Sequence, residues 1–190
     1  MQKNTYKTKW DTHTLVFMGL LVAMNLVLTR VAAFQLGFVR ITVGSVCTIM
    51  AGLWMGPLAG GICGFSADIL GCILTGQAIN PLITIAAILW GVIPALMKPL
   101  ATGKKSRKIV MLSISVIITY LLSSAFFTTL GLVLFNGFQL FAILPGRMMQ
   151  LAVMAPLYCV LTCCLYMSPI TGMVMNASAK RQEKKAARTA

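Results

Sequence analysis

The hydrophobic positions of the chain form six long runs that are separated by short polar segments. These runs cover residues 12–30, 41–57, 59–74, 81–97, 109–135 and 145–168. A helix that crosses the roughly 30 Å hydrocarbon core of a bilayer needs roughly 17 to 25 residues, which is close to the length of each run. The third run is short, and the fifth is long enough to tilt. The pattern therefore predicts an all-α membrane protein, a six-helix transmembrane bundle.

The composition supports a single membrane domain. Hydrophobic residues make up 58% of the 190 residues and charged residues only 10%, and the mean hydropathy is +0.89. A soluble domain of this size could not cover so much apolar surface. We expect an N-terminal segment over 1–11, a membrane domain over 12–168 and a basic tail over 169–190, without internal repeats.

The basic residues are concentrated in three segments, which predict the orientation of the chain. Three lysines precede the first run, five basic residues follow the fourth run, and five lie in the tail. With six helices these segments share one side, and the positive-inside rule makes that side cytoplasmic, termini included. The net charge of +13 therefore orients the protein and meets membrane lipids, and we expect no nucleic-acid partner.

The first run also resembles a signal peptide, since a basic lead precedes the apolar residues 15–28. Arg30 directly follows this run, and Val31-Ala32-Ala33 is a weak cleavage site, so we expect a retained helix.

The chain lacks the motifs of an enzyme. Gly103-Lys104 is followed by Lys105, where a P-loop needs Ser or Thr. The six cysteines have no metal-binding spacing and are expected to act as small hydrophobic residues. The only histidine, His13, lies at the start of the first helix. We therefore predict no ATP hydrolysis, no catalytic residue, no metal and no cofactor.

Asp68 is the only carboxylate within the apolar part of the chain. A charge at bilayer depth costs on the order of 3 kcal/mol or more, so it usually persists only where it faces a partner or a polar ligand. Gly60, Gly64 and Asp68 should share one face of the third helix, where the glycines let a neighbouring helix approach. Simple bundle packing also explains the glycines. At about 1.5 Å rise per residue, Asp68 should lie roughly 10 Å below the outer end of this helix.

Three arginines lie outside the basic segments. Arg30, Arg40 and Arg147 are expected at the same outer edge of the bundle. One could neutralise Asp68 while the others hold a carboxylate or phosphate, because arginine binds such groups in a bidentate manner. The pattern predicts an outward-facing pocket for an anionic organic molecule. In the alternative interpretation the arginines only reach to lipid headgroups.

Four segments together carry a resemblance to a known family. They are Met18-Gly-Leu-Leu-Val-Ala-Met-Asn-Leu-Val-Leu-Thr-Arg30, Val39-Arg-Ile-Thr-Val-Gly44, Gly56-Pro57 with Gly60-Gly61 through Asp68-Ile-Leu-Gly71, and Leu144-Pro-Gly-Arg147. From about residue 12 to 168 the chain resembles the substrate-binding S component of energy-coupling factor (ECF) vitamin transporters, and is most similar to the folate group.

The resemblance implies six helices with both termini inside, in a bacterial plasma membrane. It implies capture of a vitamin near the extracellular surface, with energy supplied by a transmembrane coupling subunit and two cytoplasmic ATPase subunits. Gly19 and Ala23 match the position where such proteins dock on the coupling subunit, and small residues permit that contact.

The folate group implies folate or a related pterin as the ligand. Asp68 would hold the amidine-like edge of the pterin through two hydrogen bonds, and the arginines would hold the glutamate tail. Gln77 and Asn80, in the polar segment after the third helix, complete the predicted substrate-binding residues.

One departure from the folate group leaves the ligand open. An aromatic-proline-glycine-aromatic element is replaced by Gly76-Gln-Ala-Ile-Asn-Pro-Leu-Ile-Thr84. Stacking on a flat ring would then fall to other aromatic residues: Phe34, Phe38, Trp54 or Phe138. Another small water-soluble vitamin or a nucleobase-like compound therefore remains an alternative ligand. A stand-alone secondary transporter and a non-transporting assembly subunit are alternative functions.

Overall fold

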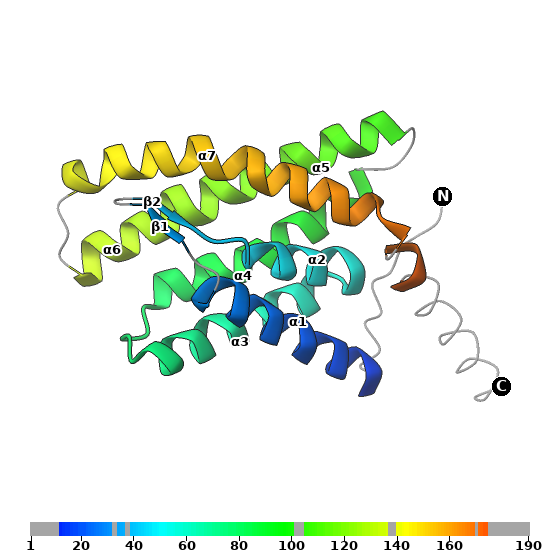
Figure 1. Ribbon diagram of the computed structural model, residues 1–190, viewed down its shortest axis with the longest axis horizontal. Helices are drawn as coiled ribbons and strands as arrows, with labels where there is room; N and C mark the ends of the chain where they lie inside the picture. The colour runs from blue at the N-terminus through cyan, green and yellow to red at the C-terminus, as the bar shows by residue number, and fades with distance from the viewer. Residues whose placement is uncertain are drawn as a thin grey trace.

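The computed structural model describes residues 12–31, 34–36, 39–100, 105–136, 140–169 and 171–174. Its elements in chain order are α1 (Thr12–Arg30), β1 (Phe34–Leu36), β2 (Val39–Ile41), α2 (Ser45–Met55), α3 (Pro57–Thr75), α4 (Pro81–Met97), the 3-10 turn η1 (Lys98–Leu100), α5 (Lys105–Tyr120), the π-helix η2 (Leu121–Thr128), α6 (Thr129–Asn136) and α7 (Leu140–Met167) (Figure 1). The predicted segment 1–11 and the basic tail beyond residue 174 lie outside the described residues.

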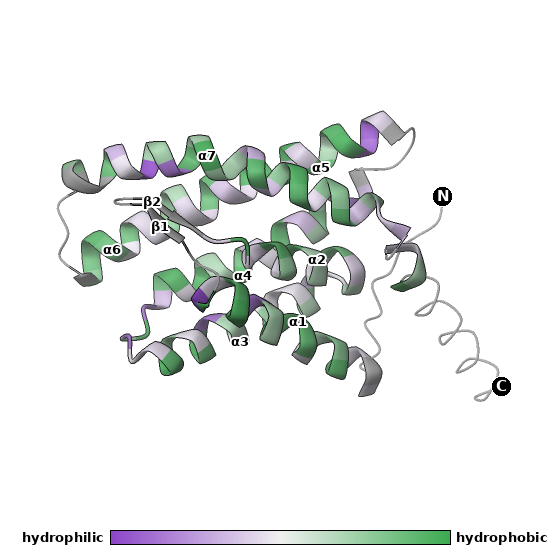
Figure 2. Cartoon of the chain, viewed as in Figure 1, coloured by the Kyte–Doolittle hydropathy of each residue, from purple (hydrophilic) through white to green (hydrophobic). Residues whose placement is uncertain are grey.

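The predicted helical membrane fold is confirmed in the described part of the chain. Three helices are long and apolar enough to cross a membrane: Pro57–Thr75, Ser106–Phe135 and Leu144–Met167. Three shorter apolar helices accompany them, at Thr14–Arg30, Ser45–Met55 and Pro81–Met97. Hydrophobic residues recur along the whole length of these helices (Figure 2). The long fifth run folds as α5, η2 and α6, which follow one another without a break. Six membrane crossings and the side of the termini stay predictions.

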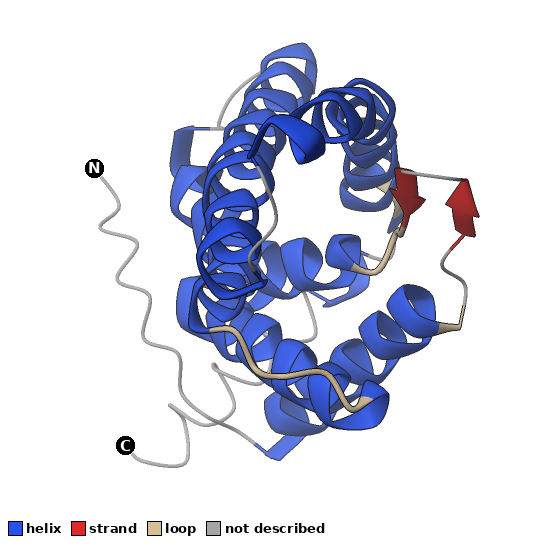
Figure 3. Ribbon diagram, turned by 90° about the vertical axis from the view of Figure 1, so that its left-hand side faces the viewer, coloured by secondary structure: helices blue, strands red, loops and turns tan. Residues whose placement is uncertain are grey.

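One short hairpin departs from the predicted helices. The second helix was expected over 41–57, but α2 covers Ser45–Met55, and Ile41 belongs to β2. β1 and β2 pair antiparallel, with Phe34 opposite Ile41 and Leu36 opposite Val39. The β-branched residues from Val39 to Val43 favour extended backbone, which explains the late start of the helix. Figure 3 shows this hairpin beside the ring of helices.

A sharp break separates α2 from α3. Gly56 has φ 99° and ψ 172°, a conformation that side chains with a Cβ rarely adopt. Pro57 then begins α3, where its missing N–H costs no helical hydrogen bond. The predicted turn at Gly56-Pro57 is therefore confirmed, although α3 starts at Pro57 and not at residue 59.

Glycines let α2, α3 and α4 approach one another closely. A Cβ added at Gly60 would lie 2.6 Å from Cα of Gly52 and 2.7 Å from the carbonyl oxygen of Gly91. A Cβ at Gly64 would lie 2.8 Å from the carbonyl carbon of Ala87. The predicted packing face of the third helix is thus confirmed, and it meets both α2 and α4.

Among the described residues, the core consists of two clusters on either side of α2. Ile49, Met50 and Leu53 pack with residues of α4, α5 and α7, whereas Cys47 and Ala51 pack with α1 and α3. The second cluster includes Cys63, and the described cysteines are free thiols, in keeping with their predicted role as small apolar residues. Packing continues beyond the predicted end of the membrane domain, because Thr171 is also buried.

Candidate ligand-binding site

The predicted acidic and basic residues come together at one end of the bundle. The helices alternate in direction, so that α1 and α3 end where α2 and α4 begin, next to the hairpin (Figure 1). We call this the Asp68 end. Arg30 is the last residue of α1, and Arg147 lies two turns into α7, which starts at this end. Arg40 lies in β2 opposite Gln35, and its side chain lies outside the description.

Asp68 is half-buried and accepts a hydrogen bond from a neighbouring helix. The hydroxyl of Thr84 on α4 donates to Oδ2 of Asp68 at 2.7 Å. Hydrogen bonds to an ionised carboxylate are stronger than those between neutral groups. Among the described side chains, no second donor and no cation contacts this carboxylate. Neutralisation of Asp68 by an arginine therefore stays a prediction.

Arg30 lies over the same face of α3, one turn further along. A Cβ at Gly71 would lie 2.6 Å from Nη2 of Arg30 and 3.1 Å from its Nε. Because Gly71 has no side chain, the guanidinium of Arg30 packs directly against the backbone of α3. Asp68 and the guanidinium of Arg30 therefore lie within about one turn of each other along α3. The sequence predicted a role for both charged residues, but it did not predict that Arg30 packs against Gly71.

Gln77 and Asn80 differ in burial and in the hydrogen bonds that their side chains make within the fold. Gln77 is exposed, and its backbone N–H donates to the Cys72 carbonyl at 3.0 Å, which with Gly76 at φ 64° ends α3. Asn80 is buried. Its Oδ1 caps α4 by accepting from the Leu82 N–H at 3.1 Å, and its Nδ2 donates to the Gly131 carbonyl at 2.9 Å. Asn80 therefore joins α4 to α6, whereas the side chain of Gln77 faces out of the protein.

An aromatic cluster lies in the other half of the bundle. The ring of Trp90 packs against Tyr158 with centroids 5.0 Å apart and against Tyr120 at 5.7 Å. Tyr158 donates its hydroxyl to the Thr42 carbonyl at 2.6 Å, and Arg147 interacts electrostatically with Tyr120. Sequence reasoning did not select these rings. Their signal was available, because each is an aromatic residue with a polar group inside an apolar helix.

Trp54, one of the predicted stacking residues, lies elsewhere. Its ring packs against Phe17 with centroids 5.8 Å apart, and its indole N–H donates to the Thr171 hydroxyl at 3.1 Å. It lies near the end of α2, where α3 begins and α4 and α7 end. We call this the Trp54 end. α2 therefore carries Trp54 away from Asp68, and stacking of Trp54 on a ligand ring stays a prediction. The side chains of Phe34, Phe38 and Phe138 lie outside the description.

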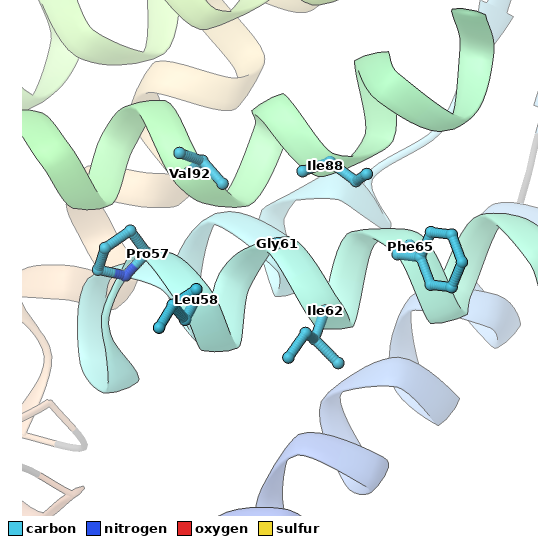
Figure 4. Close-up of a pocket in the computed structure, with 7 residues that line it drawn as sticks. All are labelled: Pro57, Leu58, Gly61, Ile62, Phe65, Ile88 and Val92. Carbon is cyan, nitrogen blue, oxygen red and sulfur yellow. The ribbon is translucent and has the colours of Figure 1, made fainter. Parts of the chain in front are cut away.

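Two apolar grooves lie along the exposed side of α3. One has a volume of about 370 Å³ and runs between α1 and α3, where Gly19 and Ala23 line it. Both residues are exposed, and nothing lies within 4 Å of a Cβ added at Gly19. The other groove, also of about 370 Å³, lies between α3 and α4, and Gly61 is among the residues that line it (Figure 4). Arg30 and Asp68 line neither groove.

Comparison with known proteins identifies the family. Residues 13–177 match the family of the ECF transporter, substrate-specific component. The chain belongs to this family of transporter components. It is 28% identical over 149 residues to the folate transporter FolT of Clostridium novyi (strain NT), covering 78% of this chain and 84% of that protein.

The first of two similar solved structures agrees with this family assignment. The crystal structure of FolT bound with folic acid superposes with a TM-score of 0.68 at 25% identity, covering 80% of this chain and 92% of that one. The structure of the S component of a bacterial ECF transporter has a TM-score of 0.47 at 19% identity, with coverage of 92% and 97%. The resemblance to ECF substrate-binding components of the folate group is thus confirmed.

Proposed function

We propose that this chain captures folate or a related pterin for an ECF-type importer in the bacterial cell membrane. The observation that carries the proposal is the match to FolT bound with folic acid, at a TM-score of 0.68 over 92% of that chain. The folate transporter of Clostridium novyi supports the same substrate class, since it matches 78% of this chain.

The chemistry of the Asp68 end suits a pterin with an acidic tail. A carboxylate can accept two hydrogen bonds from an amidine-like edge. Among the described residues, only Thr84 donates to Asp68, and it donates to Oδ2. Arg30 has its guanidinium one turn away, over Gly71, and is a candidate to hold an anionic group of the ligand. Arg40, Arg147, Gln77 and Asn80 remain further candidates for contact with the ligand.

The orientation and partners follow from charge and surface. We propose six crossings with both termini in the cytoplasm, because the basic segments then lie on one side and the Asp68 end faces outward. The open groove at Gly19 and Ala23 suits close contact with a helix of the coupling subunit, and two ATPase subunits would supply the energy.

Binding and transport can be tested separately. The purified chain should bind folate in detergent or nanodiscs, measured by calorimetry. Reconstituted vesicles should accumulate folate only when the coupling subunit, the ATPases and ATP are all present. Absence of folate binding would contradict the proposed ligand. Uptake by the chain alone would instead favour a stand-alone transporter.

A further inference from the structure

Three successive contacts between α3 and α4 lead to the hydrogen bond of Asp68. Gly60 meets the backbone of Gly91, and Gly64 meets the backbone of Ala87 one turn further along. At the next turn the pair is Asp68 and Thr84. Because glycines hold the two backbones together at the first two contacts, even a short hydroxyl side chain on α4 reaches the carboxylate on α3.

The Thr84 hydroxyl has one proton and two acceptors within reach. Its Oγ1 lies 2.7 Å from Oδ2 of Asp68 and 3.2 Å from the carbonyl oxygen of Asn80. The shorter contact, to the charged acceptor, is the stronger one. Thr84 is buried, with 7% of its surface exposed, and a β-branched side chain in a helix has few rotamers. The donor therefore has a fixed place, and it fixes one oxygen of the carboxylate.

We propose that Thr84 is a positioning residue for the ligand, which holds Oδ2 of Asp68 so that the carboxylate presents its remaining acceptor sites to the hydrogen-bond donors of the pterin ring. This inference rests on the proposed function. An ionised carboxylate has about four acceptor sites, so a single bond from Thr84 leaves enough of them for a two-point contact. Without the hydroxyl the carboxylate of Asp68 can rotate. The side chain then loses conformational entropy when the ligand binds, and this loss lowers the affinity.

A purely structural role makes a different prediction. Threonine hydroxyls in helices commonly donate to the carbonyl four residues earlier, as Thr84 could to Asn80 and as Thr119 does to Ser115 at 2.7 Å. Loss of such a bond would weaken the fold and would affect every ligand alike. Loss of a positioning bond should affect only ligands that contain the pterin.

The experiment compares three ligands on the full purified chain. Folate and pteroate contain the pterin, whereas p-aminobenzoylglutamate contains only the tail. We expect Thr84→Val to weaken the binding of folate and pteroate about tenfold, which corresponds to about 1.4 kcal/mol, and to leave the binding of p-aminobenzoylglutamate unchanged. Thr84→Ser keeps the hydroxyl and should bind folate within about twofold of the natural protein. Thr119→Val is the matched control, since it also removes a buried hydroxyl from a helix, and it should bind all three ligands normally.

Each outcome decides between the two roles. Equal folate affinity in Thr84→Val and the natural chain would overturn the inference but leave the proposed function standing. Equal losses for all three ligands would also overturn it, in favour of a structural role. If Thr84→Val does not fold, Thr84→Ala takes its place, because it also removes the hydroxyl. A loss of pteroate affinity without a loss of p-aminobenzoylglutamate affinity would support positioning, and equal losses or no loss would contradict it. A natural chain that binds neither folate nor pteroate would refute the proposed function together with this inference.

Discussion

The two ends of the bundle use polar groups in opposite ways. At the Trp54 end, each of the polar groups that we single out is bonded within the fold: Lys98 donates to the Leu53 carbonyl at 2.5 Å, and Trp54 donates to Thr171 at 3.1 Å. At the Asp68 end, the described neighbours of Asp68 use one oxygen only, and Arg30 rests on Gly71. The comparison suggests that one end closes the structure, whereas the other keeps charge available for a ligand.

Lys98 illustrates the closed end. It follows α4 and bonds to a carbonyl in the last turn of α2, where a cation interacts favourably with the helix dipole. Burial lowers the pKa of Lys98 from its ordinary value of 10.5. Burying a charged lysine costs free energy. The hydrogen bond offsets this cost, because the carbonyl would otherwise lack a donor.

The largest effect is expected from Gly91→Ala. A Cβ at Gly91 would lie 2.7 Å from Cα of Gly60 and closer still to its carbonyl, so α3 and α4 must move apart. Such overpacking of backbone against backbone should cost about 3 kcal/mol, measured as a fall in the thermal unfolding temperature in detergent. Gly19→Ala is the control, because a Cβ there meets nothing within 4 Å. Equal stability of the two variants would show that the close approach of the helices does not hold the bundle together.

Asp68→Asn should come next, and it should affect binding, not folding. An asparagine keeps the shape but loses the charge and offers fewer acceptor sites. Loss of hydrogen bonds to a charged group is worth about 2 kcal/mol, or about 30-fold in folate affinity, measured by calorimetry. The unfolding temperature should stay the same or rise, since the charge is no longer desolvated. Unchanged affinity would mean that Asp68 does not hold the pterin.

The sequence predicted features that depend on spacing within one helix, and it did not predict contacts between residues that are far apart in the chain. The helical runs and the shared face of Gly60 and Gly64 follow from local spacing along one helix, and the sequence predicted them. The contact of Arg30 with Gly71 and the hydrogen bond from Thr84 to Asp68 depend on which helices are neighbours and on how the two helices are aligned along their axes. No periodicity within one chain segment contains that information. The hairpin was missed because its strands are only three residues long, too short for an alternating pattern of hydrophobic and polar residues to appear.

Lys98→Met should lower stability by about 1 kcal/mol by removing the donor for the Leu53 carbonyl. Its pH dependence has a definite sign. Because the folded pKa is lowered from 10.5, the unfolded chain holds more protons between the two values, and Lys98 therefore contributes increasing stability as pH rises through this window. The difference in unfolding temperature between the natural chain and Lys98→Met should grow accordingly. A difference that shrinks with rising pH would contradict burial as the cause of the shift.

The smallest effect is expected from Ser123→Ala. Ser123 lies on η2, which packs against α4, and its fully buried hydroxyl has no partner among the described residues. Removing an unsatisfied buried hydroxyl should be neutral or stabilise the chain by about 1 kcal/mol. Thr119→Val removes a hydroxyl that is bonded to the Ser115 carbonyl at 2.7 Å, so it should lower the unfolding temperature instead. If Ser123→Ala destabilised the chain as much as Thr119→Val, the hydroxyl of Ser123 would be part of the internal hydrogen bonding.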